Sequence, residues 1–329
     1  LKKMHQTSST LHATKNMFTI SFYNVENLFD IDNDPQTRDD DFTPSGKKSW
    51  SYERYQDKLQ KISAVISQLG TAQSSLAPVL LGLVEVENET VLQDLIQHPN
   101  LRETPYAYVH YDSPDERGID TALLYNKQFF ELQDSKAYPN YIENAHGYRD
   151  YTRDVLWVTG KLKGDKIHLL VTHWPSRKTG GENTDQKRID AAINLQEIIH
   201  TIYATEPEAK IILLGDFNDN PTDKSVQDYL VTEAFHNPMK QLHNPISKGT
   251  TCFQGKWNLF DQIIVSKNFL KNDHSTLSFS HAEIFDKPWL KIQRGKLKGS
   301  PFRTYIHKWY QQGYSDHFPV YAMFIKKEA

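Results

Sequence analysis

The chain has 329 residues, of which 24% are charged and 12% aromatic, and its formal net charge is −3. This composition excludes bulk disorder, and the near-neutral charge argues against a protein that coats nucleic acid by bulk electrostatics. No run of about 18 apolar residues occurs, so we expect no membrane-spanning segment. The single cysteine, Cys252, excludes an intrachain disulfide and a cysteine-rich zinc site.

Residues 1–16 are polar and lack the apolar core of a signal peptide. We expect a flexible segment here, followed by a single catalytic domain over residues 17–329. The compartment stays open, because export with a signal peptide already removed is compatible with this sequence. We expect a monomer with no obligate protein partner.

Apolar runs and helical repeats alternate along the chain. Strands are predicted over residues 17–23, 78–86, 106–111, 120–125, 155–161, 166–172, 210–214, 261–265 and 318–325. Helices are predicted over 50–69, with Ser51 as a cap and Gly70 at the end, and over 185–203. The acidic stretch 30–41 lacks the glycine and glutamate of a calcium loop and is predicted as a solvated loop. The alternation, without a Gly/Ser linker, indicates one layered α/β domain.

The two halves of the chain resemble each other faintly. The sequence LLG stands before Glu85 and again before Asp216, and a later apolar strand in each half opens with an aspartate, at Asp120 and Asp261. This pattern predicts two similar half-domains whose strand ends meet. Chance similarity of buried strands is the alternative.

Polar residues cluster at the ends of the predicted strands. They are Asn24, Glu85, His173, Asp216, Asn218, Asp261, Asp316 and His317. In layered α/β folds such strand ends converge on a cleft. Carboxylate and amide oxygens suit Mg²⁺ or Mn²⁺, and histidines suit proton transfer near neutral pH. Each residue alone also fits a turn or a helix cap; together they predict metal-assisted chemistry on phosphate oxygens.

The same residues stand in the ordered motifs FYNVENLF, GLVEVEN, THWPS, LLGDFNDNP, FDQIIVS and YSDHFPV. Over residues 17–326 this set resembles the DNase I-like endonuclease/exonuclease/phosphatase superfamily, and FYNVENLFD is similar to a bacterial subgroup of it. The resemblance implies an α/β four-layer sandwich, with two packed β-sheets flanked by helices. It also implies a phosphoric ester hydrolase that uses Mg²⁺, with Mn²⁺ as the other candidate.

The resemblance further implies roles for individual residues. Glu85 would bind the metal, and Asn24 would lie beside it, holding a ligand water or a phosphate oxygen. Asp216 would orient or deprotonate the attacking water. Asn218 would bind the phosphate.

A histidine–carboxylate pair is expected among the remaining residues. Asp316 would pair with His317 or reach the metal, and His317 would contact the phosphate as a base or as a transition-state stabiliser. Neighbours in an extended strand point to opposite faces, so Asp261 is the better partner for His317. A His173 imidazolium would protonate the leaving group, and Arg117 would clamp a phosphate oxygen.

A basic segment between the Asp261 strand and Ser315 bears on the substrate. Its cations and aromatic residues are Lys287, Trp289, Lys291, Arg294, Lys296, Lys298, Arg303, Tyr305, Lys308, Trp309 and Tyr310. Such interleaving suits single-stranded nucleic acid, and Lys178, Lys187 and Arg188 are expected to add charge to the same rim. We therefore expect a nuclease, endo or exo. The alternatives are a phosphodiesterase or phosphatase on a lipid or small phosphorylated substrate, and a non-catalytic phosphate-binding protein.

Overall fold

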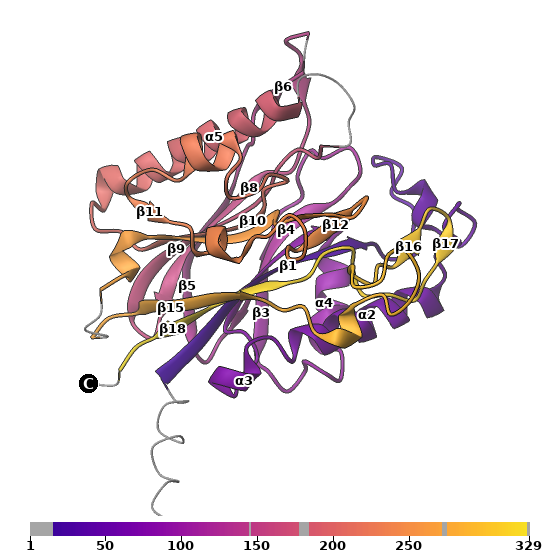
Figure 1. Cartoon of the computed structure of the whole chain (residues 1–329), viewed down its shortest axis with the longest axis horizontal. Helices are drawn as coiled ribbons and strands as arrows, with labels where there is room; N and C mark the ends of the chain where they lie inside the picture. The colour runs from indigo at the N-terminus through magenta and orange to yellow at the C-terminus, as the bar shows by residue number, and fades with distance from the viewer. Residues whose placement is uncertain (1–15, 145, 178–183, 272–274, 328–329) are drawn as a thin grey trace, which may run out of the picture.

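Two large β-sheets pack face to face in the computed structural model, which describes residues 16–144, 146–177, 184–271 and 275–327. Figure 1 shows the two sheets crossing the middle of the molecule, with helices on their outer sides. The expected flexible segment, apart from Asn16, lies outside the described residues. No helix of the described part is long and apolar enough to cross a membrane.

Each large sheet has six strands. The first has the order β15 (Ser278–Ile284), β18 (Val320–Ile325), β1 (Met17–Leu28), β2 (Leu80–Val86), β4 (Asp120–Asn126) and β3 (Tyr106–His110). The second has the order β11 (Phe235–His236), β14 (Asp261–Ser266), β10 (Ile211–Asp216), β9 (Asp165–His173), β8 (Val155–Leu162) and β5 (Phe130–Tyr138). Three two-stranded ribbons complete the described strands: β6 (Ile142–Glu143) with β7 (Arg149–Asp150), β12 (Thr251–Phe253) with β13 (Lys256–Asn258), and β16 (Tyr305–Ile306) with β17 (Trp309–Tyr310).

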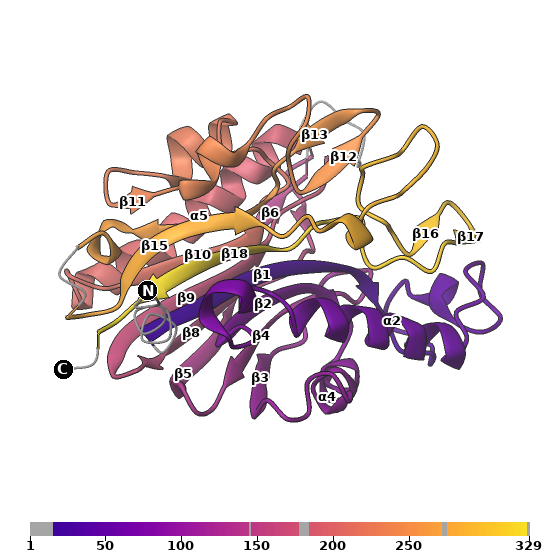
Figure 2. The same ribbon diagram turned by 60° about the horizontal axis from the view of Figure 1, so that its bottom comes forward.

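Helices cover the outer face of each sheet, giving the four layers that the resemblance implies (Figures 1 and 2). The first sheet carries α2 (Tyr52–Ile66), α3 (Thr71–Ser74) and α4 (Glu89–Gln97), and the second carries α5 (Thr184–Thr205). Short helical turns occupy the connections: η2 (Asp40–Phe42), η3 (Ser225–Leu230), η4 (Pro238–Leu242), η5 (Lys267–Phe269) and η6 (Pro288–Leu290).

The main core lies between the sheets, where apolar side chains of β1, β2 and β4 meet those of β9, β10 and β14. Gly82 of β2 explains part of the LLG pattern. A Cβ atom added there would lie 3.2 Å from the Phe22 ring and 3.3 Å from Leu214 of the other sheet. Glycine at this position therefore lets the two sheets approach closely.

The faint repeat in the sequence corresponds to a shared strand arrangement. In the first sheet β1 and β2 are parallel and β4 is antiparallel to β2, with Val86 opposite Asp120. In the second sheet β9 and β10 are parallel and β14 is antiparallel to β10, with Asp216 opposite Asp261. The prediction of two similar halves is confirmed at this level.

Several predicted boundaries were wrong. The helix predicted over 50–69 ends at Ile66, and the side chain of Ser51 makes no capping hydrogen bond although it stands at the N-cap. The first strand runs on to Leu28 through a bulge. Strands β5 and β15 were missed because they are edge strands in which most residues are exposed or half-buried, and α4 was missed because it is only nine residues long.

His168 on β9 gives the fold an acid-sensitive element far from the strand ends that carry the polar cluster. Burial lowers the pKa of His168, although Glu206 opposes the shift. The folded state therefore binds this proton less tightly than the unfolded chain, whose histidine pKa is about 6.5. The contribution of His168 to stability is full above that pH and is lost as the pH falls towards the folded-state pKa. We expect His168→Gln to lose less unfolding free energy than wild type between pH 7.5 and 5 in urea titrations; equal losses would contradict this assignment.

Candidate active site

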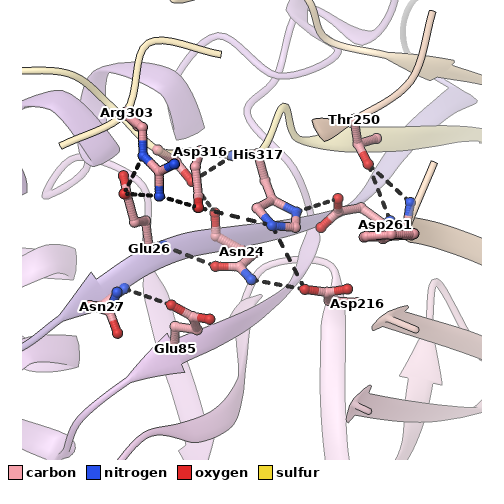
Figure 3. A network of polar contacts seen from close by, with 12 residues as sticks. Asn24, Glu26, Asn27, Glu85, Asp216, Thr250, Asp261, Arg303, Asp316 and His317 are labelled. Atoms are coloured by element: carbon pink, nitrogen blue, oxygen red, sulfur yellow. Dashed lines mark hydrogen bonds and ion pairs between the residues drawn. The ribbon is translucent and has the colours of Figure 1, made fainter. Parts of the chain in front are cut away.

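The polar residues singled out from the sequence meet where strand ends of the two sheets converge (Figure 3). Asn24 lies on β1, and Glu85 lies near the end of β2. From the other sheet, His173 and Asp216 end β9 and β10, and Asp261 begins β14. The segment before β18 brings in Asp316 and His317 (Figure 3).

Irregular backbone turns several of these side chains inwards. Both β1 and β2 contain a bulge near their ends. Glu26, Asn27, Glu85 and Asn218 all have positive φ angles, between 49° and 64°. Non-glycine residues rarely adopt this conformation, and strain of this kind concentrates at functional sites.

His317 and Asp261 form the tightest polar contact of the cluster. His317 Nδ1 lies 2.6 Å from Asp261 Oδ2, and His317 Nε2 faces Asp216 Oδ2 at 3.9 Å (Figure 3). Burial acts to lower the pKa of His317, but the carboxylates of Asp261 and Asp216 outweigh it and hold this pKa well above its usual value. Thr250 Oγ1 fixes the start of β14 by accepting from the backbone N–H of Asp261 at 3.3 Å. An oriented imidazolium is thus held at the junction of the sheets.

Asp216 lies between the two histidines. Its Oδ2 accepts from Asn24 Nδ2 at 3.0 Å and lies 3.6 Å from His173 Nε2, while its Oδ1 accepts from the Asn218 backbone at 2.9 Å. Burial raises the pKa of Asp216 to about 6, with His317 opposing and Asp261 adding to the shift. A carboxylate with a pKa near the working pH is suited to accept a proton from water.

Glu85 offers oxygen atoms for a metal ion. Its Oε2 accepts from the Asn27 backbone at 3.0 Å (Figure 3), and its Oε1 lies 3.9 Å from His173 Nε2. Asn24, Asp216 and Asp316, which Figure 3 shows at the same junction, carry oxygen atoms of the hard type that Mg²⁺ and Mn²⁺ bind. The residues present therefore fit a divalent cation. The cluster of Asp216, Asp261 and His317 also has ligand atoms within 4.8 Å of one another, but the short His317–Asp261 contact already occupies it.

The expected imidazolium at His173 is not supported. Burial lowers the pKa of His173 well below its usual value, and the nearby guanidinium groups of Arg153 and Arg117 lower it further. Both causes favour the neutral imidazole, and the buried Nδ1 of His173 makes no hydrogen bond to any described residue. Arg117 itself is exposed, and its Nε lies 3.8 Å from Asp115 Oδ1.

The sequence analysis anticipated neither the contact of Asn218 with Trp174 nor that of Asp316 with Arg303. Asn218 Nδ2 donates to the Trp174 carbonyl at 3.0 Å, so part of its amide is engaged within the protein. Asp316 Oδ2 accepts from Arg303 Nη2 at 2.8 Å, and Asp316 Oδ1 lies 3.9 Å from His317 Nε2. Asp316 therefore links the basic segment to His317.

Glu26 and Lys58 extend this link below the surface, and neither was assigned a role from the sequence. Buried Glu26 accepts from Arg303 at 3.3 Å and from the Thr304 backbone at 2.6 Å (Figure 3). Fully buried Lys58 of α2 donates to Thr304 Oγ1 and to the Tyr314 carbonyl, both at 2.6 Å. The E of FYNVENLF was the available signal for Glu26; Lys58 had none, because it stands in an ordinary amphipathic helix.

Two cations expected on the rim are paired with carboxylates, and one of these cations is buried. Arg188 is fully buried on α5 and contacts Asp219 at 2.7 Å, and Lys187 contacts Asp150 at 2.7 Å. The prediction was wrong for Arg188 because the sequence does not distinguish a cation in a buried ion pair from one on the surface. Lys178 lies outside the described residues.

Comparisons with known proteins agree with this geometry. Three solved structures with the same fold are an endonuclease/exonuclease/phosphatase family protein and a mannosyl-6-phosphatase, both from Bacteroides thetaiotaomicron, and D. rerio TDP2 complexed with single strand DNA product. Their identities to this chain are 15%, 16% and 16%, with TM-scores of 0.60, 0.58 and 0.56. They cover 95%, 94% and 94% of this chain, and this chain covers 99%, 99% and 98% of theirs.

A search of curated proteins finds no match. The family model described as "Endonuclease/Exonuclease/phosphatase family" matches residues 19–327, nearly the whole sequence, and all the motif residues lie within that range. The chain therefore belongs to the endonuclease/exonuclease/phosphatase family and is a phosphoric ester hydrolase.

Proposed function

We propose that this chain is a divalent-metal-dependent nuclease that cleaves phosphodiesters of nucleic acid, with residues 17–329 acting as one catalytic domain. The observation that carries the hydrolytic proposal is the His317–Asp261 pair facing Asp216 across the sheet junction. It combines a charged donor, aimed where negative charge develops on a phosphate, with a carboxylate able to take a proton from water.

The proposed mechanism assigns one task to each group. Asp216, held by Asn24, orients the attacking water and accepts its proton. The His317 imidazolium, held by Asp261, stabilises the developing charge on the phosphate oxygens. Neutral His173 donates a hydrogen bond from one ring nitrogen, and Arg117 and Asn218 contribute further donors to the phosphate. Such groups typically contribute about 10²–10⁴-fold each.

We assign the metal position to Glu85, with Asn24 and Asp316 as further ligands and Mg²⁺ as the preferred ion. A divalent cation bound there would supply positive charge to a non-bridging phosphate oxygen. Mn²⁺, which shares the preference for oxygen ligands, is the second candidate.

The choice of nucleic acid depends on the basic segment, residues 287–314. This stretch contains seven Lys or Arg residues and no Asp or Glu, and Arg303 places it in contact with Asp316 of the site. A polyanion with several phosphates gains more from such a segment than a single phosphate group does. The D. rerio TDP2 structure with its single strand DNA product shows a similar fold holding that class of ligand.

A phosphatase acting on a small phosphorylated substrate is the second candidate, since a mannosyl-6-phosphatase shares the fold. We expect the protein to hydrolyse bis-p-nitrophenyl phosphate and to cleave plasmid or single-stranded DNA with Mg²⁺ or Mn²⁺, and to lose both activities in EDTA. Turnover of p-nitrophenyl phosphate without diester or DNA cleavage would instead support the phosphatase.

A further inference from the structure

A groove runs along the basic segment next to the catalytic residues. It consists of two adjoining hollows of about 250 and 600 Å³, which share Ile292, Arg294 and Phe302. The smaller hollow is also lined by Lys296 and Arg303. The larger one is also lined by Trp289 and Lys291. We call the two hollows together the basic groove; its loops lie near the β16–β17 ribbon in Figure 2.

The charge of the basic groove is of one sign. No Asp or Glu is among the residues that line either hollow. Lys291 contacts Asp286 at 2.6 Å, but exposed Arg294 and Lys296 make no hydrogen bond or ion pair with any described residue. Their charges are therefore available to an anionic ligand.

The loop that carries these two cations is closed by its own backbone. Ile292 donates to the Ser300 carbonyl and Gly299 to the Ile292 carbonyl, both at 2.8 Å. Gly295 and Gly299 have φ angles of 79° and 90°, which glycine adopts without strain. Arg294 and Lys296 are thus presented from a defined turn, which lowers the entropy cost of holding a ligand.

Two aromatic rings give the basic groove flat apolar surfaces. Trp289 and Phe302 both pack against Tyr314, with ring centroids 5.2 and 6.3 Å apart in T-shaped contacts. Both rings are half-buried, so each keeps an accessible part while its position is fixed from behind. Fixed aromatic faces beside free cations suit bases that are not already stacked in a duplex.

Arg303 joins the basic groove to the catalytic residues. It lines the smaller hollow and contacts both Glu26 and Asp316, and its side chain stays 36% exposed. Asp316 in turn lies 3.9 Å from His317. If the scissile phosphate of a nucleic-acid strand lies at His317, the nucleotides that follow it on one side would therefore lie in the basic groove.

We propose that the basic groove binds the single-stranded nucleotides on one side of the scissile phosphate, with phosphates at Arg294 and Lys296 and a base against Trp289 or Phe302. This inference rests on the proposed nuclease function. It adds that the enzyme prefers single strands and reads their flanking nucleotides through stacking and charge.

The test compares three variants with wild type on a fluorescent single-stranded oligonucleotide, the matching duplex and bis-p-nitrophenyl phosphate. The double variant Arg294→Glu/Lys296→Glu reverses the free charges. Trp289→Leu removes the ring but keeps an apolar side chain against Tyr314. The matched control, Lys127→Glu/Lys267→Glu, makes the same charge change at exposed residues that follow the far ends of β4 and β14.

We expect the charge reversal to raise KM for the oligonucleotide on the order of tenfold or more. It should also make the plot of log affinity against log salt concentration less steep, by about 0.7 in slope for each phosphate that the variant no longer neutralises. Trp289→Leu should raise KM at least about fivefold, because the base has no aromatic ring to stack on. Rates on bis-p-nitrophenyl phosphate should stay at the wild-type level, because that substrate does not reach the basic groove. The control should match wild type on every substrate.

Other results would overturn the proposal in distinguishable ways. If wild type hydrolyses the small diester but no oligonucleotide, the nuclease function fails. If it cleaves the oligonucleotide and both groove variants retain wild-type KM, the nuclease stands and the basic groove is excluded as a substrate site. Equal use of the duplex would contradict the single-strand preference.

Discussion

Replacing His317 with alanine is expected to lower kcat by about 10²- to 10³-fold, the usual contribution of one donor that stabilises charge in the transition state, with little change in KM. The reason is the geometry at the sheet junction. His317 Nδ1 lies 2.6 Å from Asp261 Oδ2, which orients the ring, and His317 Nε2 faces Asp216. Asp261→Asn should lower kcat in the same direction but less, because it removes the group that orients and charges His317 rather than His317 itself. Steady-state rates on a phosphodiester measure both effects.

A matched histidine and a second substitution separate chemistry from stability. His281→Ala, at a partly exposed position on β15, should leave kcat unchanged. His317→Gln keeps a hydrogen-bond donor for the fully buried Asp261, so a folded His317→Gln variant that is also inactive excludes misfolding as the cause. Near wild-type turnover by His317→Ala would show that this pair is not catalytic.

Glu85→Gln is expected to shift the Mg²⁺ concentration for half-maximal activity upwards by roughly tenfold or more, since it removes an anionic oxygen from the proposed metal position. Saturating Mg²⁺ should restore part of the activity, because the amide oxygen remains a weaker ligand. The measurement is a Mg²⁺ titration of diester hydrolysis after treatment with EDTA. An unchanged titration would remove Glu85 from the metal site.

Glu87 provides the control for this experiment, since it follows Glu85 by two residues. Burial, reinforced by nearby carboxylates that include Asp30, raises the pKa of Glu87 to about 8. Glutamine therefore replaces a carboxyl group whose pKa lies above pH 7, and it can keep accepting from the Asp30 backbone. Glu87→Gln should leave the Mg²⁺ titration unchanged.

The sequence predicted the central strands well because burial on both faces leaves a continuous apolar run, as over residues 78–86. It missed β5 and β15 because edge strands need little apolar surface on their outer side. Helix α2 ends three residues before the predicted end. Leu69 was included because it continues the apolar repeat, but it is buried from the turn that follows the helix. The family likeness, rather than periodicity, supplied the four-layer arrangement.

For the site, the strand-end rule predicted residues that the structure brings close together, but it did not predict their electrostatics. His173 has the expected position, yet burial in the folded protein lowers its pKa, and the charges of Arg153 and Arg117 lower it further, which no local motif indicates. The link from Lys58 and Glu26 to Arg303 depends in the same way on a helix, a bulge and a loop that meet only in the folded chain. Contacts of this kind leave no periodic signal.

The most direct test of the account is phosphodiester hydrolysis by wild type and Asp216→Ala, each with Mg²⁺ and with EDTA. Asp216 contacts Asn24 of one sheet and lies near both His173 and His317, so the proposed mechanism depends on it more than on any other single residue. We predict hydrolysis by wild type that EDTA abolishes, and no hydrolysis by a folded Asp216→Ala under either condition. Turnover by Asp216→Ala near the wild-type rate, or wild-type activity that survives EDTA, would contradict a metal-dependent site at this junction.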